Sequence, residues 1–396
     1  MPITRSQKKQ RFAGGKVIAF GGSGCVFYPA LKCKSRDPNK VSKLMKNSEA
    51  NKEYENIMNI RSKLIDIPDI DDYFMLDVEK CKPQPLTESE LNELDKCKSL
   101  FPKNINESID EYTVINMPNG GQPIDDYIYD DGSFQKLYDV HLGLVKLLVN
   151  GIIPMNKMNI YHCDIKDSNI LFGSDNKTRL IDWGLYAEYE PKTSFPQVWR
   201  NRPFQYNVPF SVILFTDLFH NEYAKFIKEE DGDVKVFVTN YVKSWMKERG
   251  AGHYDFIKGI MKLLFVNSGD INESENETYT MDCIVTYIVG IVSHYKSLRM
   301  EYLDNVFIKM LDIWGLIMAY YPILEVLSNN YSKLTKGEMK LFKQLQFIIV
   351  QYLYAPDHPH EPINMPVLFN DLDDLGKLFH IKLNGTLKTY ISPFEI

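Results

Sequence analysis

The 396-residue sequence lacks several features that mark specialised classes of protein. It has no CxxC pair, and its six cysteines are scattered singly from Cys25 to Cys283, which predicts reduced thiols rather than a disulfide framework or a structural zinc site. A formal net charge of -6 argues against nucleic acid as the main partner. With 44% hydrophobic and 25% charged residues, the composition is that of a globular protein with enough apolar surface for two cores.

Long apolar runs are also missing. Residues 1–11 are polar and basic and lack the apolar core of a signal peptide, so we expect residues 1–14 to form a tail. The most apolar later stretch, Val306–Leu327, is interrupted by Lys309 and Asp312. No run therefore reaches the roughly 18 uncharged residues of a membrane span, and we expect no membrane partner.

Residues 161–171 read YHCDIKDSNIL, a polar loop between apolar runs, and an aspartate-x-glycine motif follows at Asp182. Asp164 would accept or orient the proton of an attacking hydroxyl, and Lys166 would neutralise a transferred phosphoryl group. Asn169 and Asp182 offer amide and carboxylate oxygens, which are the ligands that Mg²⁺ takes beside phosphates and water. This layout predicts a phosphoryl-transfer site.

The spacing His-x-Asp-x-Lys-x-x-Asn, followed by Asp-x-Gly, resembles the catalytic and metal-binding loops of eukaryotic-type protein kinases. Strand-like runs at Asn169–Phe172 and Arg179–Asp182 flank the loops as in that family. The resemblance implies an α+β bilobal protein-kinase-like fold. Its small β-rich N-lobe would occupy residues 15–118 and its larger, mostly helical C-lobe residues 119–396, with nucleotide between them.

The amino-acid sequences of four segments resemble a smaller group within this family. They are similar to the divergent serine/threonine kinases encoded by large nucleocytoplasmic DNA viruses: Gly24–Leu31, Val41–Met45, residues 161–169 and Asn201–Gln205. Lys166 favours serine or threonine as the acceptor, because tyrosine kinases and small-molecule kinases usually carry other residues there. This resemblance implies a cytoplasmic location, in the host cytoplasm or the virion if the protein is viral.

The glycine-rich stretch after Lys16–Phe20 predicts a strand, a tight turn and a second strand. In the family this turn holds nucleotide phosphates, because a backbone without Cβ can approach them closely and present its N–H groups. Ala19 occupies the family's first glycine position. The resemblance places nucleotide binding on Gly21, Gly22, Ser23, Gly24 and Val26.

The family also pairs a lysine of the third strand with a glutamate of the following helix. Lys43 is the first candidate for this lysine, and Lys32 is the alternative. Glu53 is the first candidate for the glutamate and Glu55 the second, both in a helix predicted over Glu49–Leu64 by its apolar periodicity. Either acid alone would equally fit a solvated helix charge.

Two insertions are predicted. The first, at about residues 80–108, follows a strand predicted at Tyr73–Val78 and contains a helix from a Thr87-x-x-Glu90 capping box to Leu100. The second, at about residues 211–301, would bind a partner, recruit substrate or only thicken the lobe, and these alternatives stay open. Its predicted helices are Val234–Arg249, His253–Val266 and Thr280–Leu298.

Several positions depart from the family pattern. Backbone groups of Asn116 and Pro118 would face adenine, but a proline has no N–H to donate. Cys163 replaces an arginine that pairs with a phosphorylated activation loop, so we expect activity that loop phosphorylation does not gate. Trp183 replaces phenylalanine and is expected to pack, and Phe210 replaces an anchoring glutamate, so the lobe must be braced otherwise.

The resemblance implies a serine/threonine protein kinase that uses ATP and Mg²⁺ and acts on protein substrates. Asp164, Lys166 and Asn169 would be catalytic, and Asp312 would accept hydrogen bonds from the catalytic-loop backbone. Two alternatives stay open: a small-molecule kinase whose acceptor pocket is formed by the second insertion, and a pseudokinase scaffold. The departures favour the scaffold, whereas the presence of every catalytic and metal-binding position counts against it.

Overall fold

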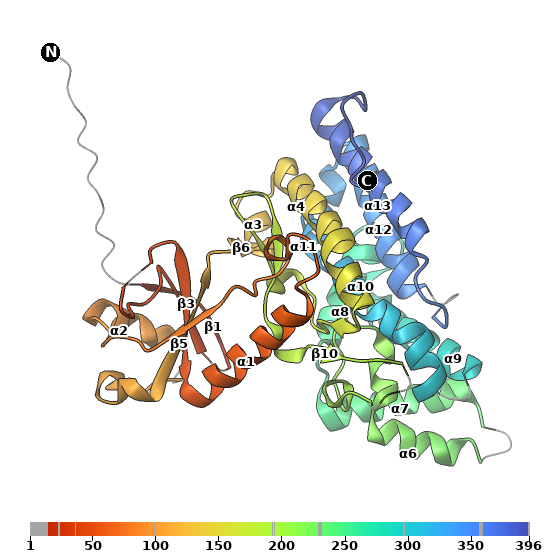
Figure 1. The fold of residues 1–396 in the computed structure, drawn as a ribbon. Helices are drawn as coiled ribbons and strands as arrows, with labels where there is room; N and C mark the ends of the chain where they lie inside the picture. Colours follow the sequence, from red (N-terminus) through yellow and green to blue (C-terminus); the bar gives the residue numbers. More distant parts are fainter. Residues whose placement is uncertain are drawn as a thin grey trace. The chain divides into compact units, whose positions relative to one another are not determined.

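The computed structural model describes residues 15–394, apart from 23, 36, 98–99, 192, 194, 229–231, 296–297 and 356–358 (Figure 1). The predicted tail, residues 1–14, and the predicted phosphate-binding residue Ser23 lie outside the described residues. The chain forms two compact units. The first contains the described residues up to Asp66 together with Met75–Gly120, and the second contains Ile67–Phe74 and Gly121 onward.

The first unit is built on one antiparallel sheet with the strand order β1-β2-β3-β5-β4. The glycine-rich hairpin has the predicted form, with Gly21 opposite Gly24. Helix α1 (Asn47–Lys63) follows the sheet's third strand and buries Ala50, Ile57 and Ile60. Ile57 and Ile60 belong to the apolar stripe that predicted this helix, and Leu64, its third member, is buried just after the helix ends. The strands are β1 (Lys16–Gly21), β2 (Gly24–Tyr28), β3 (Lys40–Lys46), β4 (Glu79–Cys81) and β5 (Tyr112–Pro118).

The strand predicted at Tyr73–Val78 is wrong. The strand of this region is β4, which begins at Glu79, and the residues just before it are irregular. Phe74 belongs to the second unit, where its backbone forms a bridge with Leu180 and its ring packs against Trp183 at a centroid distance of 5.5 Å. An apolar run therefore indicated burial here, but burial against another segment rather than in the sheet.

The first insertion completes the core of the sheet unit. Helix α2 (Glu88–Leu94) begins at the predicted capping box of Thr87 and Glu90, but it ends six residues before the predicted Leu100. A 3-10 turn follows at Asp95–Cys97, and this geometry places Leu94 and Cys97, three residues apart, on one buried face. The insertion contributes Leu86, Leu94, Cys97 and Ile105 to the same core as Phe27, Leu44 and Val114.

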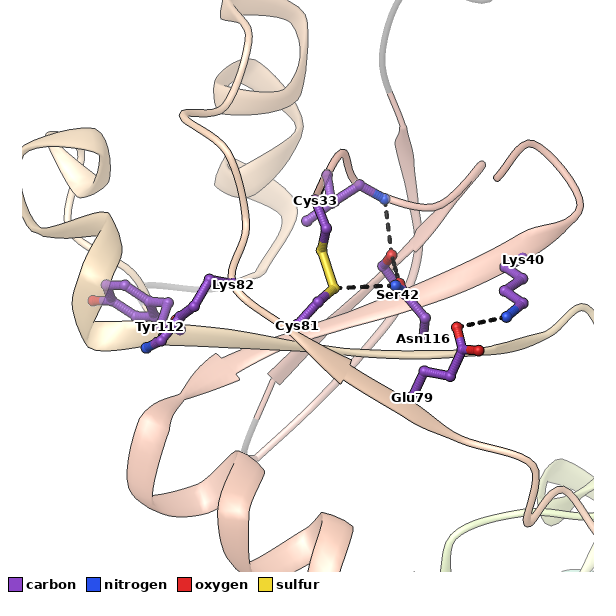
Figure 2. The surroundings of a disulfide bond; sticks show 9 residues. Cys33, Lys40, Ser42, Glu79, Cys81, Lys82, Tyr112 and Asn116 are labelled. Atoms are coloured by element: carbon purple, nitrogen blue, oxygen red, sulfur yellow. Dashed lines mark hydrogen bonds and ion pairs between the residues drawn. A yellow bond between two sulfur atoms is a disulfide. The ribbon is translucent and has the colours of Figure 1, made fainter. Parts of the chain in front are cut away.

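The prediction of reduced cysteines is wrong for four of the six. Cys25 is bonded to Cys97 and Cys33 to Cys81, with Cα atoms 6.0 and 6.2 Å apart. Figure 2 shows the second pair beside the side chains of Ser42 and Asn116. The partners are 72 and 48 residues apart, so only the folded insertion brings them together. Cys163 and Cys283 are free.

The second unit is mostly helical (Figure 1). Its long N-terminal helix begins at Phe134 with Ser133 as the N-cap, and continues through a π-helical turn to Lys157. This long helix consists of α4 (Phe134–Lys146), the π-helical turn and α5 (Ile153–Lys157). Further helices of the unit are α3 (Ile124–Tyr129), α10 (Ile308–Met318), α11 (Tyr321–Asn329), α12 (Lys336–Ile349) and α13 (Met365–Asn384). The unit also contains the short strands β6 (Gln122–Pro123), β7 (Ile160–Tyr161), β8 (Ile170–Phe172), β9 (Thr178–Leu180) and β10 (Ala187–Glu188). The loop that contains Asp164 lies between β7 and β8.

The described residues of the second insertion form four α-helices, one more than predicted. Helix α7 (Val234–Arg249) has the predicted bounds, and α8 (Tyr254–Met261) and α9 (Asn276–His294) lie within a few residues of theirs. The missed helix is α6 (Asp217–Phe226), which Thr216 caps through its side chain. It has only ten residues and buries only Phe219 fully, so its apolar period was too short to detect.

By length and composition, two helical stretches of the described residues could cross a membrane, Phe134–Lys157 and Glu301–Asn329. The expectation that no run is apolar enough is therefore wrong by this measure. Within their most apolar windows, 56% and 83% of the residues are buried inside the protein, and buried core helices commonly have this composition.

Candidate active site

The loop after β7 holds Asp164 in a network of three donors. Its Oδ2 accepts hydrogen bonds from Lys166 Nζ at 2.9 Å and from Asn169 Nδ2 at 3.0 Å, and its Oδ1 accepts one from Asn207 Nδ2 at 2.9 Å. Burial opposes the charged form of Asp164, but Lys166 and Asn207 outweigh it and lower the pKa of this carboxyl. The site thus holds an ionised carboxylate, a proton acceptor.

The backbone of the same loop is fixed by Asp312 of α10. Its two carboxylate oxygens accept hydrogen bonds from the main-chain N–H groups of His162 and Cys163, both at 2.9 Å, as the sequence predicted. Burial raises the pKa of Asp312 to about 6, and the two N–H donors act against that rise. On the same helix, a Cβ added to Gly315 would lie 2.6 Å from the carbonyl oxygen of Ile165, so the helix backbone packs directly on the loop.

The predicted metal ligands lie on neighbouring segments. The main-chain N–H of Ile181 donates to the carbonyl of Asn169 at 3.0 Å, which places Asp182 next to that residue. Asp182 is exposed and adopts the left-handed conformation with φ 64°, and the amide nitrogen of Asn169 donates to Asp164. Within the described residues, no group of three or more His, Cys, Asp or Glu could hold a metal ion. One carboxylate and one amide fit Mg²⁺ that takes its other ligands from phosphates and water.

In the first unit, the structure pairs Lys43 with Glu53. Lys43 Nζ lies 2.7 and 2.6 Å from the two carboxylate oxygens of Glu53, so the ion pair is bidentate. The alternatives do not share this arrangement: Lys32 lies beyond the end of β2 and Glu55 is on an exposed face of α1, and both side chains are exposed. The residues ten apart in sequence are joined because β3 leads directly into α1.

The glycines of the hairpin are not equivalent. A Cβ at Gly21 or Gly22 would meet no atom within 4 Å, whereas one at Gly24 would lie 2.6 Å from the carbonyl oxygen of Leu44. Gly24 is therefore required by the packing of β2 on β3, and the first two positions leave open space at the turn. Val26 lies opposite Lys43 in this register.

Asn116 and Pro118, the predicted adenine contacts, lie at the end of β5. The side chain of Asn116 accepts a hydrogen bond from Ser42 Oγ at 2.5 Å and donates to Cys81 Sγ at 3.2 Å (Figure 2). Its amide therefore belongs to the structural network around a disulfide. Pro118 ends the strand opposite Lys40.

Trp183 packs as expected, and Phe210, which replaces an anchoring glutamate, is also part of an aromatic cluster. Trp183 is buried against His162 at a centroid distance of 4.8 Å. Phe210 is fully buried and contacts Trp314 at 5.3 Å, Tyr354 at 5.6 Å and Tyr287 of the second insertion at 5.7 Å. An aromatic cluster thus joins the second insertion to the core.

Sequence reasoning missed three residues that contact the catalytic loop. Asn207 donates to Asp164, Arg202 donates to the carbonyl of Cys163, and Trp199 donates to its sulfur. Asn207 lies three residues before Phe210, and of these two residues only Phe210 was singled out from the sequence. Since asparagine and arginine are common in polar loops, their types alone gave no signal.

Comparison with known proteins supports the interpretation of this site. Residues 96–205 match the protein kinase domain family. Calcium-dependent protein kinase 4 of Plasmodium berghei (strain Anka) is 33% identical over 84 residues, and that of Plasmodium falciparum (isolate 3D7) is 32% identical over 84 residues. Each match covers 20% of this chain and only 15% of the relative's length. With a sheet unit followed by a helical unit, the family match confirms the predicted bilobal kinase fold.

Proposed function

We propose that this protein is a serine/threonine protein kinase that transfers the γ-phosphoryl group of ATP to protein hydroxyls. The observation that carries the proposal is the Asp164 carboxylate, kept ionised beside Lys166 and Asn169 on a loop whose backbone is held by Asp312. The match of residues 96–205 to the protein kinase domain supports it.

In this reaction the acceptor hydroxyl oxygen bonds to the γ-phosphorus, the bond between that phosphorus and the β–γ bridging oxygen breaks, and ADP leaves. Asp164 orients the hydroxyl and takes its proton, which requires the carboxylate to be ionised. Lys166, within 2.9 Å of Asp164, places a positive charge where the phosphoryl group is transferred. Transfer then depends on positioning and charge rather than on a covalent enzyme intermediate.

Nucleotide binding is assigned to the paired lysine and the hairpin glycines of the first unit. Lys43, held by Glu53, would contact ATP phosphates, and Gly21 and Gly22 leave room for them at the hairpin turn. Asn169 and Asp182 would hold Mg²⁺, which when bound neutralises negative charge on the phosphates. The adenine contacts of Asn116 and Pro118 remain predictions.

The acceptor residue and cellular setting are the finer parts of the proposal. Lys166 supports serine or threonine as the acceptor, by the resemblance given above. The likeness to kinases of large DNA viruses, a location in host cytoplasm or virion, and a partner bound through residues 211–301 remain predictions.

The proposal is tested by following labelled phosphate from Mg²⁺-ATP to a mixed set of proteins, with phosphoamino-acid analysis of the products. Wild type should label serine or threonine, and Asp164→Asn should lose this activity. Asp374→Asn is the matched control, because Asp374 is an exposed carboxylate of α13 that also pairs with a lysine. It should retain wild-type activity.

Three outcomes would contradict the proposal. Labelling of tyrosine alone would exclude the serine/threonine assignment. Transfer only to small molecules would favour a small-molecule kinase. No transfer, together with no Mg²⁺-dependent stabilisation by ATP, would favour a scaffold.

A further inference from the structure

The activation segment follows Asp182 and extends to Phe210, and the catalytic loop comprises residues 161–169. The segment contacts this loop through three buried side chains, which we call the segment clamp: Trp199, Arg202 and Asn207. Trp199 Nε1 donates to Cys163 Sγ at 3.3 Å and Arg202 Nη1 donates to the carbonyl oxygen of Cys163 at 2.9 Å. Asn207 Nδ2 donates to Asp164 Oδ1 at 2.9 Å and to the carbonyl of Ile165 at 3.1 Å. All three clamp residues are at least 94% buried, with exposed fractions of 0%, 6% and 1%.

The first two contacts fix the residue that directly precedes Asp164. Cys163 has φ 64°, a left-handed conformation that costs a residue other than glycine on the order of 1 kcal/mol and persists only when its surroundings enforce it. Its N–H is held by Asp312, its carbonyl by Arg202 and its sulfur by Trp199. The direction in which the chain enters Asp164 therefore depends on the activation segment.

The third contact acts on the carboxylate itself. Of its three side-chain donors, Lys166 and Asn169 have further roles in the proposed reaction, toward the phosphoryl group and the metal ion. Asn207 has no such further role, because its Nδ2 donates both to Asp164 and to the carbonyl oxygen of Ile165 in the same loop. Asn207 is thus the donor that can hold Asp164 throughout the reaction.

We propose that Arg202 and Asn207 are positioning residues that orient Asp164 from the activation segment and hold this segment in its working arrangement without a phosphate group. The proposal rests on the proposed kinase function and deepens it. The clamp donors are an indole, a guanidinium and an amide of the chain itself, and none of them requires modification. Docking of the segment and orientation of the base are then one structural event.

The test compares steady-state kinetics of phosphatase-treated wild type with two pairs of variants. Asn207→Leu removes the donor at similar volume, and Asn207→Thr keeps a hydroxyl donor. Arg202→Met removes the cation, and Arg202→Lys keeps it. The first member of each pair should lower kcat roughly 10- to 100-fold with little change in the KM for ATP, because a small misplacement of a reacting group has effects of this size. The second member should recover part of the loss.

Asn276→Leu is the matched control. Asn276 is also buried, its Nδ2 donates to a main-chain carbonyl, that of Lys258, and its Oδ1, like that of Asn207, has no partner among the described residues. It lies on α9 and should lose stability on substitution but retain wild-type kcat.

Two results would overturn this inference alone: a kcat of Asn207→Leu that falls no further than that of Asn276→Leu, or a wild type that becomes active only after its segment is phosphorylated. No transfer by wild type in either state, with no ATP binding, would overturn the kinase function and this inference together. The inference would be supported if phosphatase-treated wild type is fully active and if Asn207→Leu and Arg202→Met lower kcat with little change in the KM for ATP.

Discussion

The Lys43–Glu53 pair and the Asp164 network are held in opposite ways. The pair lies in the first unit with 20% and 27% of its side chains exposed, whereas Asp164 and Asp312 of the second unit are 6% and 1% exposed. Part-exposed ion pairs contribute about 0–1 kcal/mol, but a buried polar group left without its partner costs about 1–3 kcal/mol. The pair can therefore break at small cost, while the catalytic loop is fixed by the fold.

The two units also differ in what stabilises them. The first is small and adds an insertion and two disulfides to its single sheet, as small domains with limited cores often do. The second relies on aromatic packing, with Phe210 at a junction between α10 and the second insertion. Substitutions in the two units should accordingly change different properties.

The largest effect on stability is expected for Phe210→Ala. Truncating a fully buried phenylalanine leaves a cavity, which should lower the free energy of unfolding by about 3–5 kcal/mol in chemical denaturation. Phe347→Ala is the control, because Phe347 is 46% exposed on α12 and loses fewer contacts. Equal losses in the two variants would show that Phe210 does not brace the second unit.

Reduction of the disulfides should act on the first unit alone. Opening loops of 72 and 48 residues relaxes a constraint on the unfolded chain that is worth about 2–4 kcal/mol per disulfide. Hydrogen exchange should therefore accelerate at amides of β2 and β3 when dithiothreitol is added, and should stay unchanged in α10 and α12. A variant with serine at Cys25, Cys33, Cys81 and Cys97 should not respond to the reductant. Exchange that rises throughout the chain would contradict this division.

Asp312→Asn should weaken the loop anchor. An amide keeps one acceptor oxygen but turns a donor toward a main-chain N–H, so stability should fall by about 1–3 kcal/mol. Because the same N–H groups precede Asp164, kcat should fall as well, whereas Glu53→Gln should lower activity with little loss of stability. Melting temperature and initial rates, measured on both variants, check this contrast. Equal losses of stability in Asp312→Asn and Glu53→Gln would contradict this contrast.

A pH effect is expected from the second unit. Burial lowers the pKa of His141 to about 3, from an ordinary value of 6.5, so the folded state keeps it neutral while the unfolded chain takes up a proton. The contribution of His141 to stability should be constant above pH 6.5 and should fall below it, by up to about 1.4 kcal/mol per pH unit toward pH 3. His141→Gln should flatten this slope in denaturation curves, and exposed His220→Gln should not. Equal slopes in wild type and His141→Gln would refute it.

What could be predicted from the sequence depended on how local the information was. Asp164, Lys166 and Asn169 lie within six residues, and each residue type matches one chemical task, so their grouping was predictable. The pairing of Lys43 with Glu53 followed from one strand and one helix in succession. The disulfides and Asn207 were not predictable, because their partners are 43 to 72 residues away and meet only after the first insertion and the activation segment have folded.

The most direct test of the proposed kinase function, with Lys43 as the lysine that binds ATP, compares Lys43→Met with Lys32→Met. Both lysines belong to the first unit, but only Lys43 is paired with Glu53. Transfer from labelled Mg²⁺-ATP, measured at equal folded fraction, should be lost in Lys43→Met and retained in Lys32→Met. Retained transfer in Lys43→Met, or equal loss in both variants, would contradict the account.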